Sequence, residues 1–281
     1  MKHIAIPIRT NYWQPGDDYI DIIRSSIMDK VEDGDVIVLS EKAIAVAKGR
    51  LIDESRFQPS LLAKFIARFW MRYMWGYILS KLCHIKLENV YRLRNYPKKE
   101  GAYHKQMALM YSGFLQALRH GSEGGIDVSN IPLAYACLPL ADPYSETVKI
   151  RNEIQDATKK KVFVMIVDTD MTYSWYNFHI TPRPRPMKGI RSFGGVIAYV
   201  IGRALKLKYR ATPLAIVPRM NVNEALYTAQ SAHRARGSGA GRTVWDVAER
   251  FNVGLTDVTW EMLDRVDQYP IVLVRMSKKD D

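Results

Sequence analysis

The segment KVFVMIV at residues 161–167 is the clearest strand of the sequence, and three polar residues, Asp168, Thr169 and Asp170, follow it directly. A short apolar run bounded by polar residues is typical of a strand buried in a sheet. The preceding residues 145–157 have the pattern of a helix. We therefore predict a helix that leads into a buried strand, and we expect that strand to end at Asp168.

Other segments of the chain give a similar mixture of strands and helices. Strands are predicted at 3–8, 35–40, 213–218 and 271–275, and helices near 20–31, 106–119, 221–235 and from about 243. The two kinds of element alternate without a strict strand–helix–strand rhythm. This favours the α+β class, with mixed sheets and packed helices. A length of 281 residues is typical of about two domains or one large domain.

Residues 60–84 predict a long aromatic helix with Ser60 as its N-cap. Lys64, Arg68 and Arg72 are spaced four residues apart, so they lie on one stripe of that helix. Three interpretations of the stripe stay open. It is a solvated face over an aromatic core contact, a basic surface for an anionic ligand or a membrane, or a subunit interface, where aromatic residues and Arg are enriched.

Three further segments have the composition of loops. Residues 92–105 are basic and turn-rich, which predicts a surface loop. Residues 181–195 are rich in Pro, Arg and Gly and are expected to be irregular and exposed. The stretch Gly237–Arg242 has the glycine content of a phosphate-binding loop but not the GxxxxGK[ST] pattern, so it is predicted to be a flexible linker.

The chain carries 41 Lys and Arg against 29 Asp and Glu, which gives a formal net charge of +12. Such an excess implies an anionic partner: nucleic acid, membrane headgroups, a nucleotide or a polycarboxylate. Two cysteines are too few for a disulfide scaffold or an all-cysteine zinc site. The N-terminal segment lacks the apolar region of a secretion signal, and four basic residues interrupt the longest apolar stretch, Leu61–Cys83. We therefore expect a cytoplasmic protein without a membrane span.

Three polar clusters carry candidate metal ligands. Asp168 and Thr169 follow the predicted strand, Asp127 follows a pair of glycines, and Glu224 begins the helix predicted at 221–235. Oxygen ligands of this kind suit a hard cation such as Mg²⁺ or Mn²⁺. Each cluster by itself is also typical of an ordinary turn, and the sequence does not show that the three meet. The patterns of serine hydrolases and zinc proteases are absent from the sequence.

Several motifs occur in a specific order along residues 1–235. They are DGDVIVLSEK at 33–42, AKGR at 47–50, GGIDVSN at 124–130, DPYSETVKIRNEI at 142–154, VFVMIVDT at 162–169 and Gly202-Arg203-x-Leu205. This combination resembles the coenzyme F420-0:L-glutamate ligase family, the gamma-glutamyl ligases.

The resemblance implies a gamma-glutamyl ligase-like α+β unit over residues 1–281, divided into two subdomains at about 1–160 and 161–281 that share one site, and an intertwined homodimer. It implies a GTP-dependent enzyme that works with Mg²⁺ or Mn²⁺. The reaction would join the amine of L-glutamate to a carboxylate of an anionic cofactor precursor through an acyl phosphate. The acceptor stays open between F420-0 and a folate-like or pteroate-like compound.

The same resemblance implies roles for individual residues. The metal ligands would be Asp127, Asp168, Thr169 and Glu224. The nucleotide would be bound by Ser40, Lys42 and Asn130, and the substrates by His120, Gly124, Gly125 and Arg203. No catalytic residue is assigned.

The chain departs from the family pattern after Asp168-Thr169. The family usually continues with Gly-Arg-Pro-Trp-Arg, whereas here the sequence is DMTYSW at 170–175, so Arg183, Arg185 or Arg191 would have to replace a missing arginine. This departure motivates a second hypothesis, a catalytically inactive nucleotide- or anion-binding protein that keeps the fold. The positive charge motivates a third, a basic nucleic-acid-binding protein.

Overall fold

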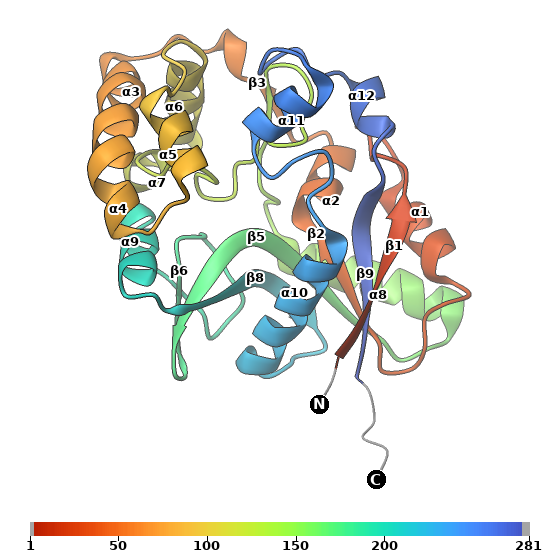
Figure 1. Ribbon diagram of the computed structural model, residues 1–281. Helices are drawn as coiled ribbons and strands as arrows, with labels where there is room; N and C mark the ends of the chain where they lie inside the picture. Colours follow the sequence, from red (N-terminus) through yellow and green to blue (C-terminus); the bar gives the residue numbers. More distant parts are fainter. Residues whose placement is uncertain (1–2, 277–281) are drawn as a thin grey trace.

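The computed structural model of the chain describes residues 3–276 and is built on a seven-stranded mixed sheet (Figure 1). Its strands are β1 (His3–Thr10), β2 (Val36–Ser40), β5 (Phe163–Trp175), β6 (Phe178–Thr181), β7 (Arg191–Ser192), β8 (Lys208–Val217) and β9 (Gln268–Met276). The order is β1-β9-β2-β5-β6-β7, and β8 also pairs with β5. β2 and β5 are parallel, whereas β9 is antiparallel to both β1 and β2. The α+β class is confirmed.

Helices cover both faces of this sheet. Alternate residues of each central strand point to opposite sides, and both sets are apolar, so each face packs against helices. Ile37 and Leu39 of β2 face α1 (Tyr19–Ile27), α2 (Glu41–Ala47) and α8 (Pro143–Thr158) in one apolar core. Val36 and Val38 face α10 (Val222–Arg236) in a second core on the other side. Burial on both faces explains why the central strands are continuous apolar runs rather than alternating ones.

A separate group of helices lies beside the sheet (Figure 1). It contains α3 (Leu61–Phe65), the π-helical segment η2 (Ile66–Leu79), α4 (Ser80–Leu82), α5 (Leu87–Arg94), α6 (Glu100–Tyr111), α7 (Phe114–Ala117) and α9 (Val196–Ala204). The first three follow one another without a break and form the long helix predicted at 60–84. Its N-cap is confirmed, because the Ser60 hydroxyl accepts a hydrogen bond from the Ala63 amide at 3.2 Å.

Short elements complete the molecule. The two-stranded sheet pairs β3 (Leu51–Asp53) with β4 (Tyr135–Cys137), and a 3₁₀ turn, η1 (Glu54–Arg56), follows β3. Near the C-terminus, α11 (Val244–Phe251) and α12 (Trp260–Asp264) precede β9. Strands from both sides of residue 160 join in the large sheet. No helix of the described residues, 3–276, is long and apolar enough to cross a membrane.

Two local predictions were wrong, and a third was right only in part. The surface loop expected at 92–105 is mostly helical, since α5 and α6 occupy most of it. The segment 181–195 is irregular, but it is not uniformly exposed, because Arg183 is buried. The strand expected to end at Asp168 continues to Trp175, with a shift in its pairing to β8 between Asp168 and Met171. Such a bulge bends the strand and changes where its side chains point, which a strand-end interpretation misses.

Candidate functional site

A cavity of about 590 Å³ opens at the edge of the sheet where the parallel pairing of β2 and β5 ends. Ser40 is the last residue of β2, and Thr169 lies just beyond that pairing on β5. The loop at 127–130 and the segment 230–242, which runs from α10 into the glycine-rich loop, supply the other walls. Because neighbouring parallel strands end at one edge, the fold gathers polar residues from distant parts of the chain there.

The lining of this cavity is strongly basic. Lys42, Arg234, Arg236 and Arg242 surround it, and Asp127 is the one carboxylate among the lining residues that the structure describes. The same environment affects His233, which also lines the cavity. Burial, together with the charges of the three arginines, lowers the pKa of His233 to about 4, so its imidazole is neutral at neutral pH. Four cations against one anion make this cavity suited to a ligand with several negative charges.

Asp127 is held in place as an ionised carboxylate. Its Oδ1 accepts hydrogen bonds from the amide and the hydroxyl of Ser129, both at 2.8 Å, and its Oδ2 lies 3.1 Å from the Lys42 ammonium. Lys42 also donates to the Ser129 carbonyl at 2.9 Å. Burial acts to raise the pKa of Asp127, but Lys42 and Ser129 outweigh it and hold that pKa below its ordinary value.

The glycine-rich loop is part of the cavity wall rather than a free linker. The Asn130 amide group donates to the Gly241 carbonyl at 2.7 Å, and its oxygen accepts from the Ala240 amide at 2.7 Å. A side chain at Gly239 would lie 2.9 Å from the same oxygen of Asn130. The prediction of a flexible linker is therefore replaced by a loop that one asparagine fixes through its backbone.

A second cavity, of about 330 Å³, adjoins the first. Both are lined by Asp127, Ser129, Thr169 and Arg242, so these residues form a shared wall. The second cavity has an aromatic side, which is formed by Tyr96, Tyr135 and Trp245. The ring centroids of Tyr96 and Trp245 lie 6.2 Å apart. A cationic cavity thus adjoins a partly aromatic cavity.

His120 lies in the second cavity, where its Nε2 is 2.9 Å from the Tyr199 hydroxyl. Burial, aided by the neighbouring Arg119 charge, lowers the pKa of His120 to about 4. Its ring is also packed edge-on against Trp75, at 4.6 Å between centroids. His120 is therefore a neutral, fixed side chain.

A buried charge cluster forms the floor of the second cavity. His104 lies 2.6 Å from Glu54 and 3.1 Å from Glu123, and Lys105 pairs with Glu123 as well. Burial acts to lower the pKa of His104, but the two carboxylates outweigh it and raise that pKa to about 10. The imidazole is therefore charged at neutral pH.

This cluster predicts how stability depends on pH. Because the folded-state pKa of His104 is about 10 and the ordinary value is 6.5, the folded state holds the extra proton between these pH values. The contribution of His104 is complete below pH 6.5 and is lost as the pH rises from there to 10. We expect urea unfolding of a His104→Gln variant to show a flatter decline over this range. The exposed His84→Gln change should keep the native slope, and a native slope in His104→Gln would contradict the assignment.

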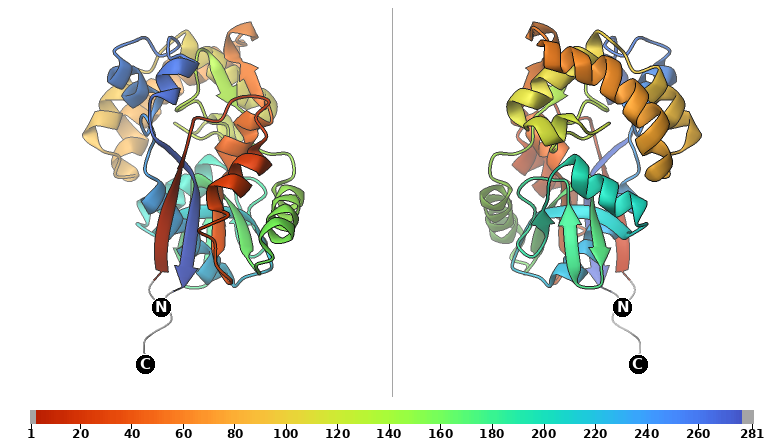
Figure 2. Two further views of the ribbon diagram at one scale, coloured as in Figure 1. Left: turned by 90° about the vertical axis from the view of Figure 1, so that its right-hand side faces the viewer. Right: turned by 90° about the vertical axis from the view of Figure 1, so that its left-hand side faces the viewer.

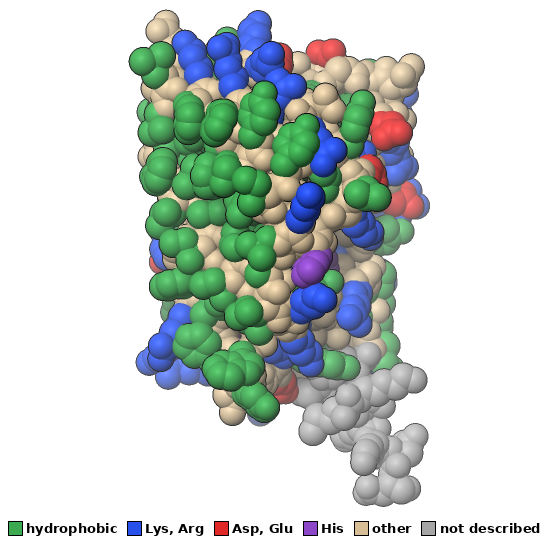
Figure 3. Space-filling model, turned by 60° about the vertical axis from the view of Figure 1, so that its left-hand side comes forward, with side chains coloured by type: hydrophobic (Ala, Val, Ile, Leu, Met, Phe, Trp, Pro, Cys, Tyr) green, Lys and Arg blue, Asp and Glu red, His purple; other side chains and the backbone are tan. Residues whose placement is uncertain are grey.

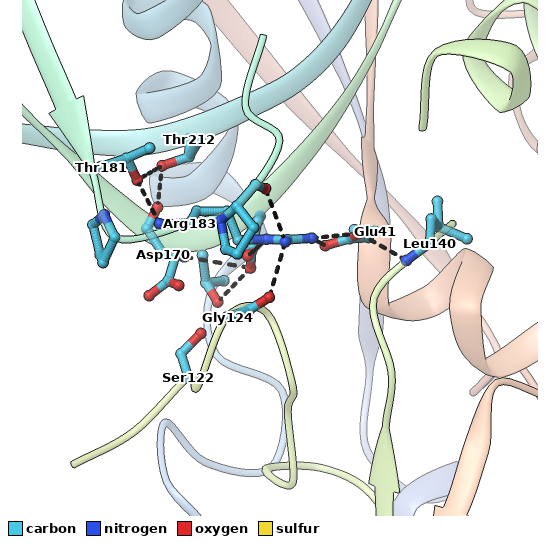
Figure 4. Close-up of polar contacts among 12 residues, drawn as sticks. Glu41, Ser122, Gly124, Leu140, Asp170, Thr181, Arg183 and Thr212 are labelled. Carbon is cyan, nitrogen blue, oxygen red and sulfur yellow. Dashed lines mark hydrogen bonds and ion pairs between the residues drawn. The ribbon is translucent and has the colours of Figure 1, made fainter. Parts of the chain in front are cut away.

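Asp168 belongs to a different buried network, because it accepts a hydrogen bond from Arg183. Figure 4 shows Arg183 at the centre of this network, between Glu41 and Gly124. The Arg183 guanidinium donates to both Glu41 carboxylate oxygens at 2.8 Å, to Asp168 Oδ2 at 2.6 Å and to the Gly124 carbonyl at 2.9 Å. One arginine therefore links the start of α2, the bulge of β5 and the turn that leads to Asp127. Arg183 does not line either cavity, but it holds together three segments that lead into the cavity walls.

The segment that departs from the family pattern takes part in a second buried pair. Asp170 accepts two hydrogen bonds from the Arg119 guanidinium, at 2.8 and 2.9 Å. Both side chains are almost completely buried. This pair ties the bulged part of β5 to the chain just before His120.

The structure brings together some of the predicted site residues and separates others. Ser40, Lys42, Asp127, Asn130 and Thr169 line the basic cavity, and His120 lines the adjoining one. Asp168, Gly124 and Gly125 line neither cavity. They lie next to Arg183 instead.

Two predicted site residues, Arg203 and Glu224, line neither cavity. Arg203 donates to the carbonyls of Cys83 and His84, so it ties α9 to the end of the long helix. Glu224 lies in the first turn of α10, whereas the cavity is lined by the end of that helix. The predicted metal set of Asp127, Asp168, Thr169 and Glu224 is therefore not assembled at one place.

Sequence motifs did not reveal the arginines at 234, 236 and 242. The one sequence signal that could have indicated them is the presence of three arginines around a glycine-rich stretch, RARGSGAGR at 234–242. Their significance depends on where the loop lies, since basic residues at the end of a helix are also typical of helix capping.

The residues at the shared wall fit a metal ion that is bound mainly by substrate phosphates and water. Among residues 3–276, no three His, Cys, Asp or Glu side chains are placed to hold a metal ion together. Asp127 and Asp168 are each paired with a cation. Magnesium commonly binds through one or two carboxylates together with water and substrate phosphates. The donors here fit an ion that arrives with phosphates, and they do not form a protein-only cage.

Gly125 gives a local test of the network behind the site. Its φ is +95°, and a Cβ there would lie 2.4 Å from the Arg183 guanidinium carbon. We expect Gly125→Ala to lower the melting temperature clearly, because both the backbone and the buried arginine oppose the added methyl group. Gly121→Ala is the matched control, since a Cβ there meets nothing within 4 Å. Equal melting temperatures for the two variants would contradict the close packing around Arg183.

Comparison with known proteins places the chain in a family. Residues 7–215 match the family model described as F420-0:Gamma-glutamyl ligase. The chain belongs to the F420-0:gamma-glutamyl ligase family. It is 35% identical over 288 residues to a Methanocaldococcus jannaschii protein described as "Uncharacterized protein MJ1361", a match that covers 98% of this chain and 97% of that protein.

A second relative of this gamma-glutamyl ligase family member is described as "Coenzyme F420:L-glutamate ligase" from Archaeoglobus fulgidus. It is 28% identical over 158 residues, which is 55% of each chain. The family-model match ends at residue 215, so the arginines of the 230–242 wall lie beyond it. The family supports a glutamate-ligase role, and the basic wall is a feature that this chain's own C-terminal part provides.

Proposed function

We propose that this protein is a GTP-dependent ligase that joins the amine of L-glutamate to a carboxylate of an anionic coenzyme F420 precursor. The observation that carries the proposal is the pair of adjoining cavities with Asp127, Thr169 and Arg242 in their shared wall. A ligase of this kind must hold a nucleotide triphosphate and a carboxylate acceptor next to each other. The basic cavity would hold the nucleotide and the partly aromatic cavity would hold the acceptor.

The basic cavity is the proposed nucleotide site. Lys42, Arg236 and Arg242 would bind phosphate oxygens and stabilise the negative charge that develops on the transferred group. In the first step, an acceptor carboxylate oxygen attacks the γ-phosphorus, which gives an acyl phosphate and GDP. In the second, the glutamate amine attacks the acyl carbon, inorganic phosphate leaves, and the new amide nitrogen loses a proton.

The second cavity is the proposed acceptor site. Tyr96 and Trp245 offer faces against which a flat ring system can stack. The relative described as a coenzyme F420:L-glutamate ligase supports an F420 precursor as this acceptor. A folate-like or pteroate-like compound has a comparable flat ring and carboxylate, and it is the alternative acceptor in the experiment below.

A divalent cation, Mg²⁺ or Mn²⁺, is proposed to enter with the nucleotide, and Asp127 and Thr169, which line both cavities, would hold it. Bound there, it would neutralise charge on the phosphates. The homodimer expected from the family remains part of the proposal.

The function is tested by a reaction of purified protein with L-glutamate and GTP or ATP, in the presence of Mg²⁺ or Mn²⁺. Parallel reactions contain F420-0, pteroate or dihydrofolate as acceptor. We expect nucleoside diphosphate to form only when both glutamate and an acceptor are present, and the acceptor to gain the mass of one glutamyl unit. Mass spectrometry of the product identifies the acceptor, and the two nucleotides identify the phosphate donor.

Two results would overturn the proposal. Saturable nucleotide binding without product from any acceptor would assign the chain to a catalytically inactive nucleotide-binding role. Nucleotide hydrolysis that does not depend on glutamate would show that the chain does not catalyse the proposed ligase reaction. Equilibrium binding of GTP, measured by calorimetry, separates the first of these results from a simple failure to bind.

A further inference from the structure

One side of the molecule carries an extended surface of exposed apolar side chains. It is formed by the helix at 61–82, by α9 and by the turn between β5 and β6, which lie on the same side of the molecule in the right-hand view of Figure 2. Figure 3 shows hydrophobic side chains spread over this side, with Lys and Arg at its upper and lower ends and along its right-hand side. Exposed apolar surfaces of this extent mark sites of interaction rather than ordinary protein surface.

A row of four aromatic rings forms the centre of this surface. Phe65, Phe69, Tyr73 and Tyr77 follow one another every four residues, and their centroids lie 5.2, 5.2 and 6.3 Å apart. These side chains are 48–55% exposed. The rings thus contact each other along the outside of the helix and leave much of their area in water.

The row cannot turn inward, because the opposite side of the same helix is already packed. Ile66, Met71 and Trp75 are completely buried in the core of the helical group. The Trp75 indole also donates to the Leu118 carbonyl at 2.7 Å. Both sides of the helix are therefore apolar, but among residues 3–276 only one side is packed against other parts of the protein.

The exposed surface continues from the helix onto α9 and the β5–β6 turn. Leu205 at the end of α9 is 67% exposed, and Trp175 and Tyr176 at the β5–β6 turn are 65% and 87% exposed. Tyr and Trp are the residues that lie at the boundary between headgroups and acyl chains when a protein contacts a bilayer.

The charged residues of the segments that form this surface have one sign. The segments that form it, 61–86, 175–178 and 191–209, contain nine Lys and Arg and no Asp or Glu. Arg68, Lys81, Lys206 and Lys208 among them are exposed. In the view of Figure 3, acidic side chains lie mainly along the right-hand margin. The complement of this surface is therefore apolar and negatively charged.

We propose that this surface docks on an anionic lipid bilayer, with the aromatic row at the level of the headgroups and the flanking Lys and Arg on the phosphates. Apolar burial and attraction to anionic lipid act together in such binding. A second copy of the chain fits less well. A two-fold interface would place the same cations opposite each other, and these segments offer no carboxylate to pair with them.

The proposal is tested with the full chain by co-sedimentation with vesicles of phosphatidylglycerol or of phosphatidylcholine. We expect binding to the anionic vesicles only, weakened by salt, with a blue shift of tryptophan fluorescence. The variant Phe65→Ser/Phe69→Ser/Tyr73→Ser should lose binding. The variant Arg68→Glu/Lys81→Glu/Lys206→Glu should weaken it by roughly a hundredfold. Tyr144→Ser is the matched control, since this exposed tyrosine lies on α8, outside the surface.

Several results would overturn the proposal. These are equal binding to both kinds of vesicle, no binding to either, or unchanged binding by the aromatic variant. Light scattering of the free protein gives a further outcome. A native dimer that the aromatic substitutions convert to monomer, without any vesicle binding, would assign the surface to a second copy. Circular dichroism of each variant checks that its fold is kept, as the exposed positions predict.

Discussion

The Arg183→Met variant is expected to unfold with a free energy about 3–5 kcal/mol lower than that of the native chain, because removing one partner of a buried ion pair leaves uncompensated charge. Arg183 is the common donor to Glu41, Asp168 and the Gly124 carbonyl, and its side chain is 2% exposed. Methionine fills a similar length but offers none of these hydrogen bonds. Two carboxylates would lose their cation at once.

Urea unfolding followed by circular dichroism measures this loss. Arg185→Met is the matched control from the same segment, because Arg185 is exposed and donates to a backbone carbonyl, that of Ala141, at 2.8 Å. Adding Glu41→Gln and Asp168→Asn to the Arg183→Met variant should restore part of the stability, since neutral amides are less costly to bury than charges. Equal stability of the Arg183 and Arg185 variants would contradict the central role of Arg183.

The Asp127→Asn variant is expected to reduce ligase turnover roughly 100-fold, because an amide would hold the proposed divalent cation more weakly than the carboxylate, and that cation would neutralise the phosphates. Asn keeps the size of the side chain and its contact with Ser129 but removes the charge that balances Lys42. Asp127 lines both cavities, so its charge acts where the transferred phosphoryl group and the acceptor would meet.

Glu224→Gln distinguishes this site from the set of metal ligands predicted from the sequence. Because Glu224 lines neither cavity, its variant should keep turnover close to native. Steady-state product formation under saturating substrates compares the two variants, and thermal melts confirm that both are folded. Native turnover in Asp127→Asn, or an equal loss in Glu224→Gln, would contradict the proposed arrangement.

Part of the site was predictable because the relevant residues are close to strand ends. Ser40 and Lys42 lie at the end of a strand that its apolar run identifies, and Thr169 lies just beyond the last residue paired to that strand. The position of Asp127 after two glycines also marked it as a polar turn residue. These signals are local, so a sequence motif is enough to find them.

The role of Asp168 was not predictable by the same reasoning. Its neighbours in sequence indicate a strand end with a free carboxylate, but the strand continues through a bulge and the carboxylate pairs with an arginine 15 residues away. Likewise, the loop 237–242 is fixed by Asn130, which lies more than 100 residues earlier. Contacts over such separations leave no local pattern.

The class of the fold, the strands and helices of the sheet layers, the capped aromatic helix and the family could all be predicted from the sequence, because periodicity, capping and ordered motifs are properties of neighbouring residues. Which charges meet depends on how the chain packs in space. The tertiary structure placed three arginines of the C-terminal part in the wall of the cavity that Asp127 lines, turned Asp168 toward Arg183, and left one side of the aromatic helix uncovered. Burial and electrostatic pairing depend on distances in space, and these exist only once the chain has folded.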